Sequence, residues 1–147
     1  MRPSIVPFAP HDEAAMDMLL QAAELPTEDI TPEILEHFLV AHLDKALIGC
    51  AGVEILGEVG LLRSVAVDEA HRGAGLGKDL VAAAEELAKQ EGVQRLYLLT
   101  TTAEGFFVGL GYRKLPREEA PADIAGTEQF ASLCPSSSSF MMKTLAQ

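Results

Sequence analysis

Between Arg63 and Gln90, a strand-like run passes directly into a glycine-punctuated turn and then into an apolar helix. The run RSVAV is small and β-branched, which is typical of a strand. Three glycines punctuate the turn HRGAGLGK, and apolar side chains recur at helical spacing from Leu76 onward. This order predicts a strand–helix–strand crossover that packs on one face of a sheet.

The rest of the chain supplies partners for this crossover. Expected strands cover residues 2–7, 38–43, 46–55, 59–67, 93–100, 112–114 and 140–145, and expected helices cover 11–23, 75–90 and 103–110. A short helix is expected to begin at Thr31-Pro32, and one helical turn within the polar segment 116–139. The order predicts an α/β fold of mixed type, with about seven strands and helices on both faces of the sheet. A single domain over residues 1–147 fits the length.

Composition limits the partners of the chain. Its 11 basic and 22 acidic residues give a net charge of -11, which argues against nucleic acid but permits a small anionic ligand. No apolar run reaches the roughly 18 residues of a membrane span, and the N-terminus has no secretory pattern. The expected location is therefore cytoplasmic. The histidines and two cysteines show no metal-binding spacing, so no metal is expected, and a homodimer is left open.

Three phosphate-binding patterns compete for the turn. The P-loop pattern requires glycine where Arg72 stands and Ser or Thr where Asp79 stands, so it fails twice. The dinucleotide fingerprint fails at Lys78, and the next strand ends in threonines instead of an acidic residue. The pattern R-x-x-G-x-G is satisfied by Arg72, Gly75 and Gly77. A glycine turn that only connects a strand to a helix is the alternative without a ligand.

The segment LLRSVAVDEAHRGAGLGKDLVAAA resembles the acetyl-CoA-binding segment of the GNAT N-acetyltransferases. The later segment AEGFFVGLGY resembles the second signature of that family, a short helix ending in Leu-Gly-Phe or Leu-Gly-Tyr. The resemblance runs from about Leu61 to the C-terminus, whereas the first 60 residues match only in element order. It implies the GNAT fold, acetyl-CoA as co-substrate and direct acetyl transfer to a primary amine.

The turn has the physical features that a pyrophosphate requires. Backbone N–H groups gather at the helix N-terminus, glycines leave them accessible, and the helix dipole adds about 0.3–1 kcal/mol per charge. Arg72 adds positive charge more directly than Lys78. Coenzyme contacts are predicted at Val65, Ala66, Val67, Arg72, Gly73, Ala74, Gly75, Leu76, Gly77, Lys78, Thr100, Phe106 and Phe107.

By the same resemblance, the strand Leu61–Val67 parts from the strand Arg95–Thr100, and the pantetheine arm lies in the gap. The small apolar residues around Val65 suit an arm that pairs with the backbone. The resemblance also gives the backbone N–H of Val65 a catalytic role, the polarisation of the thioester carbonyl.

The proton-transfer groups depart from the family pattern. Phe107 stands where many relatives have a tyrosine that protonates the CoA thiolate, and phenylalanine cannot donate a proton. Tyr112 follows the short helix, a place that favours a structural role. Glu54 and Glu58 are the candidate bases, and each is alternatively a solvated surface carboxylate. Deprotonation through water requires neither.

Arg63 stands in a strand where many relatives have an acidic residue. Its forked donors suit a carboxylate, phosphonate or arsenate-like group. The segments LRSVAV and LYLLTTTAEGFFVGLGY resemble N-acetylglutamate synthases and related amino-acid acetyltransferases. We therefore expect the α-amine of a small anionic amino-acid-like acceptor. The alternative is that Arg63 pairs with an acidic neighbour at the sheet edge.

The tail TEQFASLCPSSSSFMMKTL resembles the end of GNAT proteins associated with arsenic resistance. Acceptor contacts are predicted at Arg63, Ser64, Thr100, Thr101 and Cys134. Thr101 or Thr102 is also expected to cap the following helix, and Cys134 fits a buried apolar position better than a thiol ligand. One rival function is acetylation of protein N-termini or polyamines. The other is a CoA-binding sensor without catalysis, for which Phe107 is the only indication in the sequence.

Overall fold

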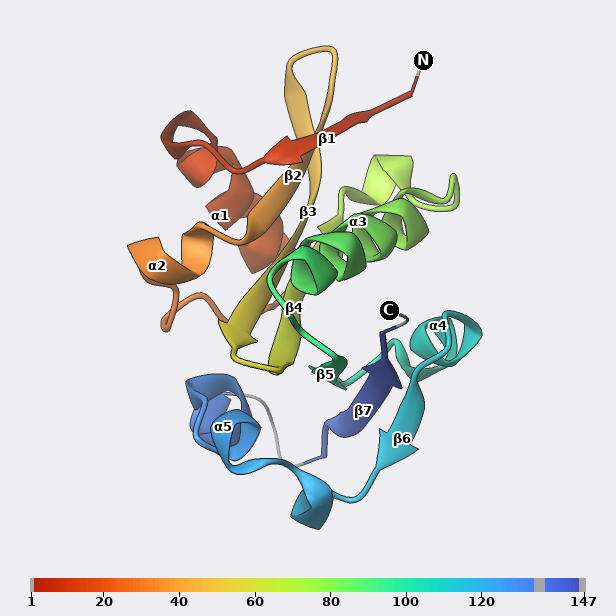
Figure 1. Cartoon of the computed structure of the whole chain (residues 1–147). Helices are drawn as coiled ribbons and strands as arrows, with labels where there is room; N and C mark the ends of the chain where they lie inside the picture. Colours follow the sequence, from red (N-terminus) through yellow and green to blue (C-terminus); the bar gives the residue numbers. More distant parts are fainter. Residues whose placement is uncertain (1, 134–136, 146–147) are drawn as a thin grey trace.

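A seven-stranded sheet with the order β1-β2-β3-β4-β5-β7-β6 forms the centre of the computed structural model, which describes residues 2–133 and 137–145 (Figure 1). The strands are β1 (Ser4–Pro7), β2 (Phe38–Leu43), β3 (Ala46–Leu56), β4 (Val59–Val67), β5 (Arg95–Thr100), β6 (Arg113–Leu115) and β7 (Ser139–Thr144). The pair β4–β5 is parallel, and the other described pairs are antiparallel. The predicted mixed sheet of about seven strands is confirmed.

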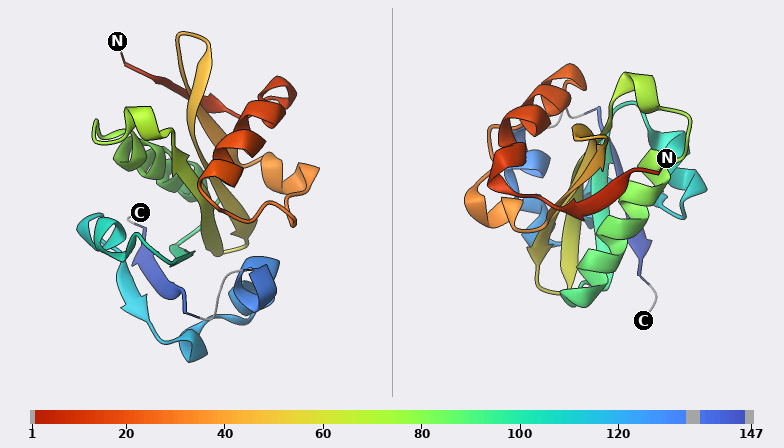
Figure 2. Two further views of the ribbon diagram at one scale, coloured as in Figure 1. Left: turned by 180° about the vertical axis from the view of Figure 1, so that it is seen from behind. Right: turned by 90° about the horizontal axis from the view of Figure 1, so that it is seen from above.

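Helices cover both faces of the sheet. They are α1 (Glu13–Ala22), α2 (Pro32–Leu35), α3 (Leu76–Gln90), α4 (Glu104–Gly109) and α5 (Ala122–Ala125). The right-hand view of Figure 2 shows α1 and α2 on one side of the sheet and α3 on the other. Within the described ranges, no helix is both long enough and apolar enough to cross a membrane.

Alternation along the strands divides the core between these two faces. Leu39, Ala51 and Leu62 point toward α3, whereas Val40 and Cys50 point toward α1. Leu61, the neighbour of Leu62, faces α5 with the C-terminal strands. Each face thus has its own apolar layer, which fixes the strand register because a shift by one residue would exchange the two layers.

Short turns join the antiparallel strands at the predicted places. Asp44 and Lys45 both adopt positive φ, 50° and 70°, in the two-residue turn between β2 and β3. Gly57, with φ of 75°, turns β3 into β4. The segment expected to hold one helical turn instead contains a 3-10 helix at Arg117–Glu119, α5, and a π-helix at Gln129–Leu133. Its polar composition had hidden the apolar anchor Ile124, which is fully buried.

Candidate active site

β4 and β5 pair over only part of their lengths. Their parallel register runs from Val59–Arg95 to Leu62–Leu98 and then stops. Beyond this point β4 stays paired with β3 as far as Val67, and β5 stays paired with β7 as far as Thr100. The two facing edges therefore separate, and their N–H and C=O groups are available to an extended ligand arm. The predicted parting of the central strands is confirmed.

A β-bulge lies where β4 turns away. Cys50 pairs with Ala66, but Gly52 pairs with Arg63, so one additional residue is accommodated in β4 at Ser64 and Val65. Ser64 has a φ of 58°, a left-handed conformation that L-residues adopt at a cost of about 1–2 kcal/mol. Because a bulge bends its strand and redirects the residues beside it, this one re-aims the backbone at Val65.

The glycine turn lies beyond the same end of β4. Gly73 and Gly75 have φ of 88° and 86°, and a Cβ atom at either would meet no atom within 4 Å. Gly75 is the N-cap of α3 and makes no side-chain cap, so N–H groups of the first turn are free of intrahelical partners. At Gly77 a Cβ would lie 3.4 Å from the ring of Phe106. The turn therefore exposes backbone donors, as anion binding at a helix N-terminus requires.

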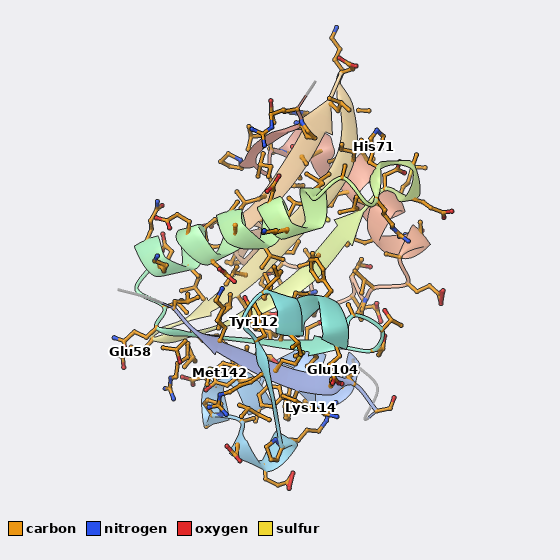
Figure 3. The ribbon with its side chains drawn as sticks, turned by 90° about the vertical axis from the view of Figure 1, so that its right-hand side faces the viewer. Glu58, His71, Glu104, Tyr112, Lys114 and Met142 are labelled. Carbon is orange, nitrogen blue, oxygen red and sulfur yellow. The ribbon has the colours of Figure 1, made fainter. Side chains whose placement is uncertain are left out.

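The other predicted coenzyme residues of the turn differ in what they present. Arg72 is exposed and donates from Nε to the Val67 carbonyl at 3.1 Å, which ties the turn to the end of β4. Lys78 is exposed, whereas the side chain of Leu76 is buried in the core. Only the backbone of Leu76 is thus placed for a ligand. His71, at the edge of the turn in Figure 3, contacts Asp68 at 3.0 Å.

The two phenylalanines of α4 have different surroundings. Phe106 is 41% exposed and its ring lies next to Gly77, whereas Phe107 is buried. The Phe107 ring packs edge-on against Phe106 and against Tyr112. Phe106 is therefore the better placed of the two to contact a ligand at the turn.

The hydroxyl of Tyr112 is held in a hydrogen-bond network and is not free to protonate a leaving thiolate. Its hydroxyl donates to Glu85 at 2.8 Å, and Lys143 binds the same carboxylate at 3.0 Å. Burial, together with the charge of Glu85, raises the pKa of Tyr112 well above its ordinary value of 10. This geometry agrees with the structural role that its sequence position favours.

Arg63 is paired with two carboxylates. Its guanidinium contacts Asp29, in the α1–α2 connection, at 2.6 Å and 2.7 Å, and Glu54 of β3 at 2.7 Å. Burial acts against these charges, but the hydrogen bonds and charges of the partners outweigh it. The pKa of Arg63 is therefore raised above its ordinary value and that of Asp29 is lowered below its ordinary value. The structure therefore contains the alternative predicted for Arg63, pairing with acidic neighbours. The pairing lies in the interior of the sheet instead of at its edge.

Neither candidate base is free at the open end of β4. Glu54 is held by Arg63. Glu58 lies in the β3–β4 turn at the paired end of β4, where it accepts a hydrogen bond from Gln94 at 3.1 Å. Seven strand positions separate it from Val65, roughly 20 Å at the usual strand rise. Figure 3 shows Glu58 and His71 on opposite sides of the view, beyond the two ends of α3. Direct proton transfer needs hydrogen-bond reach, so Glu58 could serve as a base at the expected transfer point only if the two were brought together.

The threonine hydroxyl at the start of α4 is not the one predicted. The hydroxyl of Thr100, instead of Thr101 or Thr102, accepts from the backbone N–H of Ala103 at 3.1 Å. Thr101 is exposed. Thr100 also pairs with Ser139, whose hydroxyl donates to Glu104 at 2.5 Å, so the first turn of α4 is fixed to β7. Cys134 lies outside the described residues.

A small cavity of about 50 Å³ occupies the space between the parting strands. It is lined by Leu25, Pro26, Leu61, Leu62, Arg63, Ser64, Leu99 and Gln129. The cavity thus lies beside the bulge, on the face covered by the α1–α2 connection and the C-terminal segment. Within the described parts of the chain, no group of three or more His, Cys, Asp or Glu side chains is arranged to hold a metal.

Comparison with known proteins identifies the family to which these features belong. Residues 7–112 match the Acetyltransferase (GNAT) family. Because this match covers more than half of the chain, the chain belongs to the GNAT family, and the family resemblance of the sequence is confirmed.

Relatives of known sequence are similar over part of their length. An uncharacterized N-acetyltransferase of Chlorobaculum tepidum is 36% identical over 95 residues, 62% of this chain and 61% of that protein. An amino-acid acetyltransferase of Aeromonas salmonicida is 31% identical over 91 residues, 60% of this chain but 21% of that protein. The match thus spans less than two thirds of either relative.

Solved structures share the fold. N-acetylglutamate synthase from Neisseria gonorrhoeae, complexed with coenzyme A and N-acetyl-glutamate, aligns with a TM-score of 0.87 at 19% identity, over 100% of this chain and 36% of that one. Rv2747 from Mycobacterium tuberculosis, also in complex with CoA, aligns with a TM-score of 0.83 at 24% identity, over 98% of this chain and all of that one.

Proposed function

We propose that this chain transfers the acetyl group of acetyl-CoA to the primary amine of a small amino-acid-like acceptor. The observation that carries the proposal is that three features lie together at one end of β4. They are an unpaired strand edge, a bulge, and a turn whose glycines leave the backbone uncovered. Each feature alone has a structural explanation. Together they match the needs of a long ligand with a pyrophosphate at one end and an extended arm.

In this proposal the coenzyme follows the path that these features define. Its pyrophosphate accepts hydrogen bonds from the backbone between Gly73 and Gly77, with Arg72 adding positive charge. Its pantetheine arm pairs with the free edge of β4 near Val67. The thioester carbonyl then accepts the hydrogen bond of the Val65 N–H, which stabilises the negative charge that develops on the oxygen during transfer.

The transfer itself requires a neutral amine. Its nitrogen attacks the thioester carbon, the N–C bond forms as the C–S bond breaks, the nitrogen loses a proton and the thiolate gains one. Phe107 cannot supply that proton, the Tyr112 hydroxyl is held by Glu85, and Glu54 is held by Arg63. We therefore assign both proton transfers to water that reaches the open end of β4.

An amino acid as the acceptor is supported by the names of relatives. Sequences 31% and 27% identical to this chain are amino-acid acetyltransferases, of Aeromonas salmonicida and Pseudomonas aeruginosa. An anionic acceptor connected with arsenic resistance rests on the sequence of the tail alone, and part of that tail lies outside the described residues.

The test is loss of thioester absorbance when purified protein and acetyl-CoA are mixed with individual amines. The panel contains free amino acids, a phosphinic and an arsenic-containing amino-acid analogue, spermidine and a peptide with a free N-terminus. Turnover with free amino acids or their analogues is the expected result. Binding of acetyl-CoA without turnover on any amine would instead identify a sensor.

A cationic acceptor is the second candidate, and one observation favours it. The buried cluster at Arg63 contains two carboxylates and one guanidinium, so it carries a net negative charge, and the chain as a whole carries -11. Turnover confined to spermidine would establish this candidate in place of the amino acid.

A further inference from the structure

Arg63 lies at the point where β4 parts from β5. Arg63 pairs with Gly52 on β3 immediately before the bulge, and the next residue is the left-handed Ser64. The Arg63 side chain is only 1% exposed although it is charged. A buried charge in this place requires an explanation in terms of the groups that it holds.

All five N–H donors of the guanidinium have partners within the chain. Nε donates to the Ser64 hydroxyl at 3.3 Å. Nη1 donates to Asp29 at 2.6 Å and to Glu54 at 2.7 Å. Nη2 donates to Asp29 at 2.7 Å and, at 3.5 Å, to the Pro26 carbonyl. No donor is left for the carboxylate of an acceptor, even though Arg63 lines the cavity.

These partners come from three separate parts of the chain. Pro26 and Asp29 belong to the connection between α1 and α2, Glu54 to β3, and Ser64 to the bulge itself. One planar group thus joins the segment that covers the cavity to the strand that carries the Val65 amide. Lysine could not replace it, because an ammonium has three donors and lacks the planar fork.

Ser64 is held from its other side as well. Its carbonyl accepts a hydrogen bond from the buried Cys50 thiol at 3.2 Å. The hydroxyl is therefore fixed by Arg63 and the carbonyl by Cys50, which retains the bulge residue at positive φ. The peptide that follows Ser64 carries the N–H of Val65, so its direction depends on this conformation.

We propose that Arg63 is a positioning residue for acetyl transfer, which fixes Ser64 and thereby the direction of the Val65 N–H, and that it does not bind the acceptor's carboxylate. The inference rests on the proposed function, because it concerns the geometry of that reaction. It replaces the sequence-based assignment of Arg63 to the acceptor with a role inside the protein.

The principal test compares Arg63→Lys with the unmodified chain on an amino acid that is turned over and on the amine formed by removing its carboxyl group. We expect kcat to fall about 10- to 100-fold, and equally, on both acceptors, since small displacements at a reacting centre have effects of this size. Kd for acetyl-CoA should stay within about twofold, because the glycine turn is untouched. Arg95→Lys, at the paired end of β5, is the matched control and should leave kcat unchanged.

A loss confined to the amino acid, with its KM raised, would show that Arg63 binds the carboxylate and would overturn the inference. An unchanged kcat on both acceptors would overturn it too. If the unmodified chain turns over no amine at all, the proposed function fails first, and the role of Arg63 in transfer fails with it.

A second measurement asks whether Arg63 acts through Ser64. Glycine adopts positive φ without the strain that a Cβ imposes, so Ser64→Gly should depend less on Arg63. Arg63→Lys should therefore cost at most about a third as much, as a fold-change in kcat, in the Ser64→Gly background. Equal losses in both backgrounds would contradict the inference.

A third variant guards against a failure to fold. Should Arg63→Lys be unfolded by circular dichroism, the triple variant Arg63→Met, Asp29→Asn and Glu54→Gln removes the three charges together, which buried clusters tolerate far better than loss of one partner. It should bind acetyl-CoA and lose kcat to the same extent. A folded triple variant with full kcat would overturn the proposal.

Discussion

The two segments that flank the open end of β4 are built in opposite ways. At the glycine turn, Cβ atoms at Gly73 and Gly75 would meet nothing, and the backbone itself faces outward. At the bulge, the backbone is surrounded by a fully hydrogen-bonded guanidinium on one side and a buried thiol on the other. The glycine turn leaves its backbone uncovered, which we call the open side. At the bulge, side chains hydrogen-bond to the backbone and to one another, which we call the packed side.

This difference indicates how each side recognises its ligand. Backbone N–H groups in such a turn favour anions through their own dipoles, and they require little from the rest of the protein. The packed side depends on Asp29 and Glu54 being held in place, so it is sensitive to changes at a distance. Substitutions should therefore affect stability on the packed side and ligand affinity on the open side.

The largest expected effect is the loss of Arg63 as a charge. Arg63→Met leaves the largely buried carboxylates of Asp29 and Glu54 without their counter-ion. Removing one partner of a buried pair costs about 3–5 kcal/mol. Urea unfolding measures this loss. Arg95→Met, at an exposed position, should change stability by less than about 0.5 kcal/mol. A loss below about 1 kcal/mol at Arg63 would mean that the packed side does not depend on its charges.

The next effect concerns the glycine that pairs with Arg63. A Cβ at Gly52 would lie 2.2 Å from the Phe38 ring, so Gly52→Ala should lower the free energy of unfolding by about 1–3 kcal/mol. Adding Phe38→Leu should recover part of it by making room. Gly126→Ala is the control, since its Cβ would lie 3.4 Å from the nearest atom, the Ala122 carbonyl oxygen. Equal losses at both glycines would show that the Phe38 ring does not limit the space at Gly52.

On the open side, substitution should affect binding instead of stability. A Cβ at Gly77 makes only ordinary contact with Phe106, so Gly77→Ala should fold normally. In the proposed function the added methyl group would occupy space beside the coenzyme, and we expect the affinity for acetyl-CoA to fall about tenfold, or about 1.4 kcal/mol. Calorimetric titration checks this. Undiminished affinity would show that the turn only connects β4 to α3.

Acid should weaken the packed side selectively. Because the pKa of Asp29 is lowered in the folded chain, its contribution to stability is full above its unfolded pKa of about 3.9 and declines as the pH falls through the folded value. The stability difference between the unmodified chain and Asp29→Asn should therefore shrink between about pH 5 and pH 2. A constant difference over this range, measured by urea unfolding, would mean that the carboxylate charge contributes nothing.

The smallest effect is chemical and requires no substitution. Burial raises the pKa of the Cys50 thiol to about 12, so the reactive thiolate is scarce at pH 8. Mass spectrometry of the Cys50 peptide after brief alkylation should find less than about a tenth of the labelling obtained in denaturant. Equal labelling would show that the region beneath the bulge is open to solvent.

The sequence predicted what local pattern determines. The strands, the long helix and the glycine turn follow from alternation, helical spacing and glycine, all of which act between near neighbours. The parting of β4 and β5 came from the family resemblance of the same stretch. The glycine turn and the parting of the strands were therefore visible in advance.

The contacts of Arg63 were not, because they join distant residues. Asp29 pairs with Arg63 across 34 positions, and Gln129 reaches Asp29 across 100. Nothing near Arg63 in the sequence indicated those partners, so its charge suggested a ligand. The bulge was hidden for another reason, since its left-handed residue is a serine where a glycine would have marked it.

The position of β7 has a consequence for how the site assembles in time. β7 lies between β5 and β6, so within the described residues β6 joins the sheet only through β7, although β6 precedes β7 in the chain. The β5 side of the opening between β4 and β5 is therefore completed only when β7, a strand far along the chain, pairs with β5. Such non-local pairing is slow to form. We expect pulse-labelled hydrogen exchange during refolding to protect the β2–β4 meander first, and β5, β6 and β7 later and together.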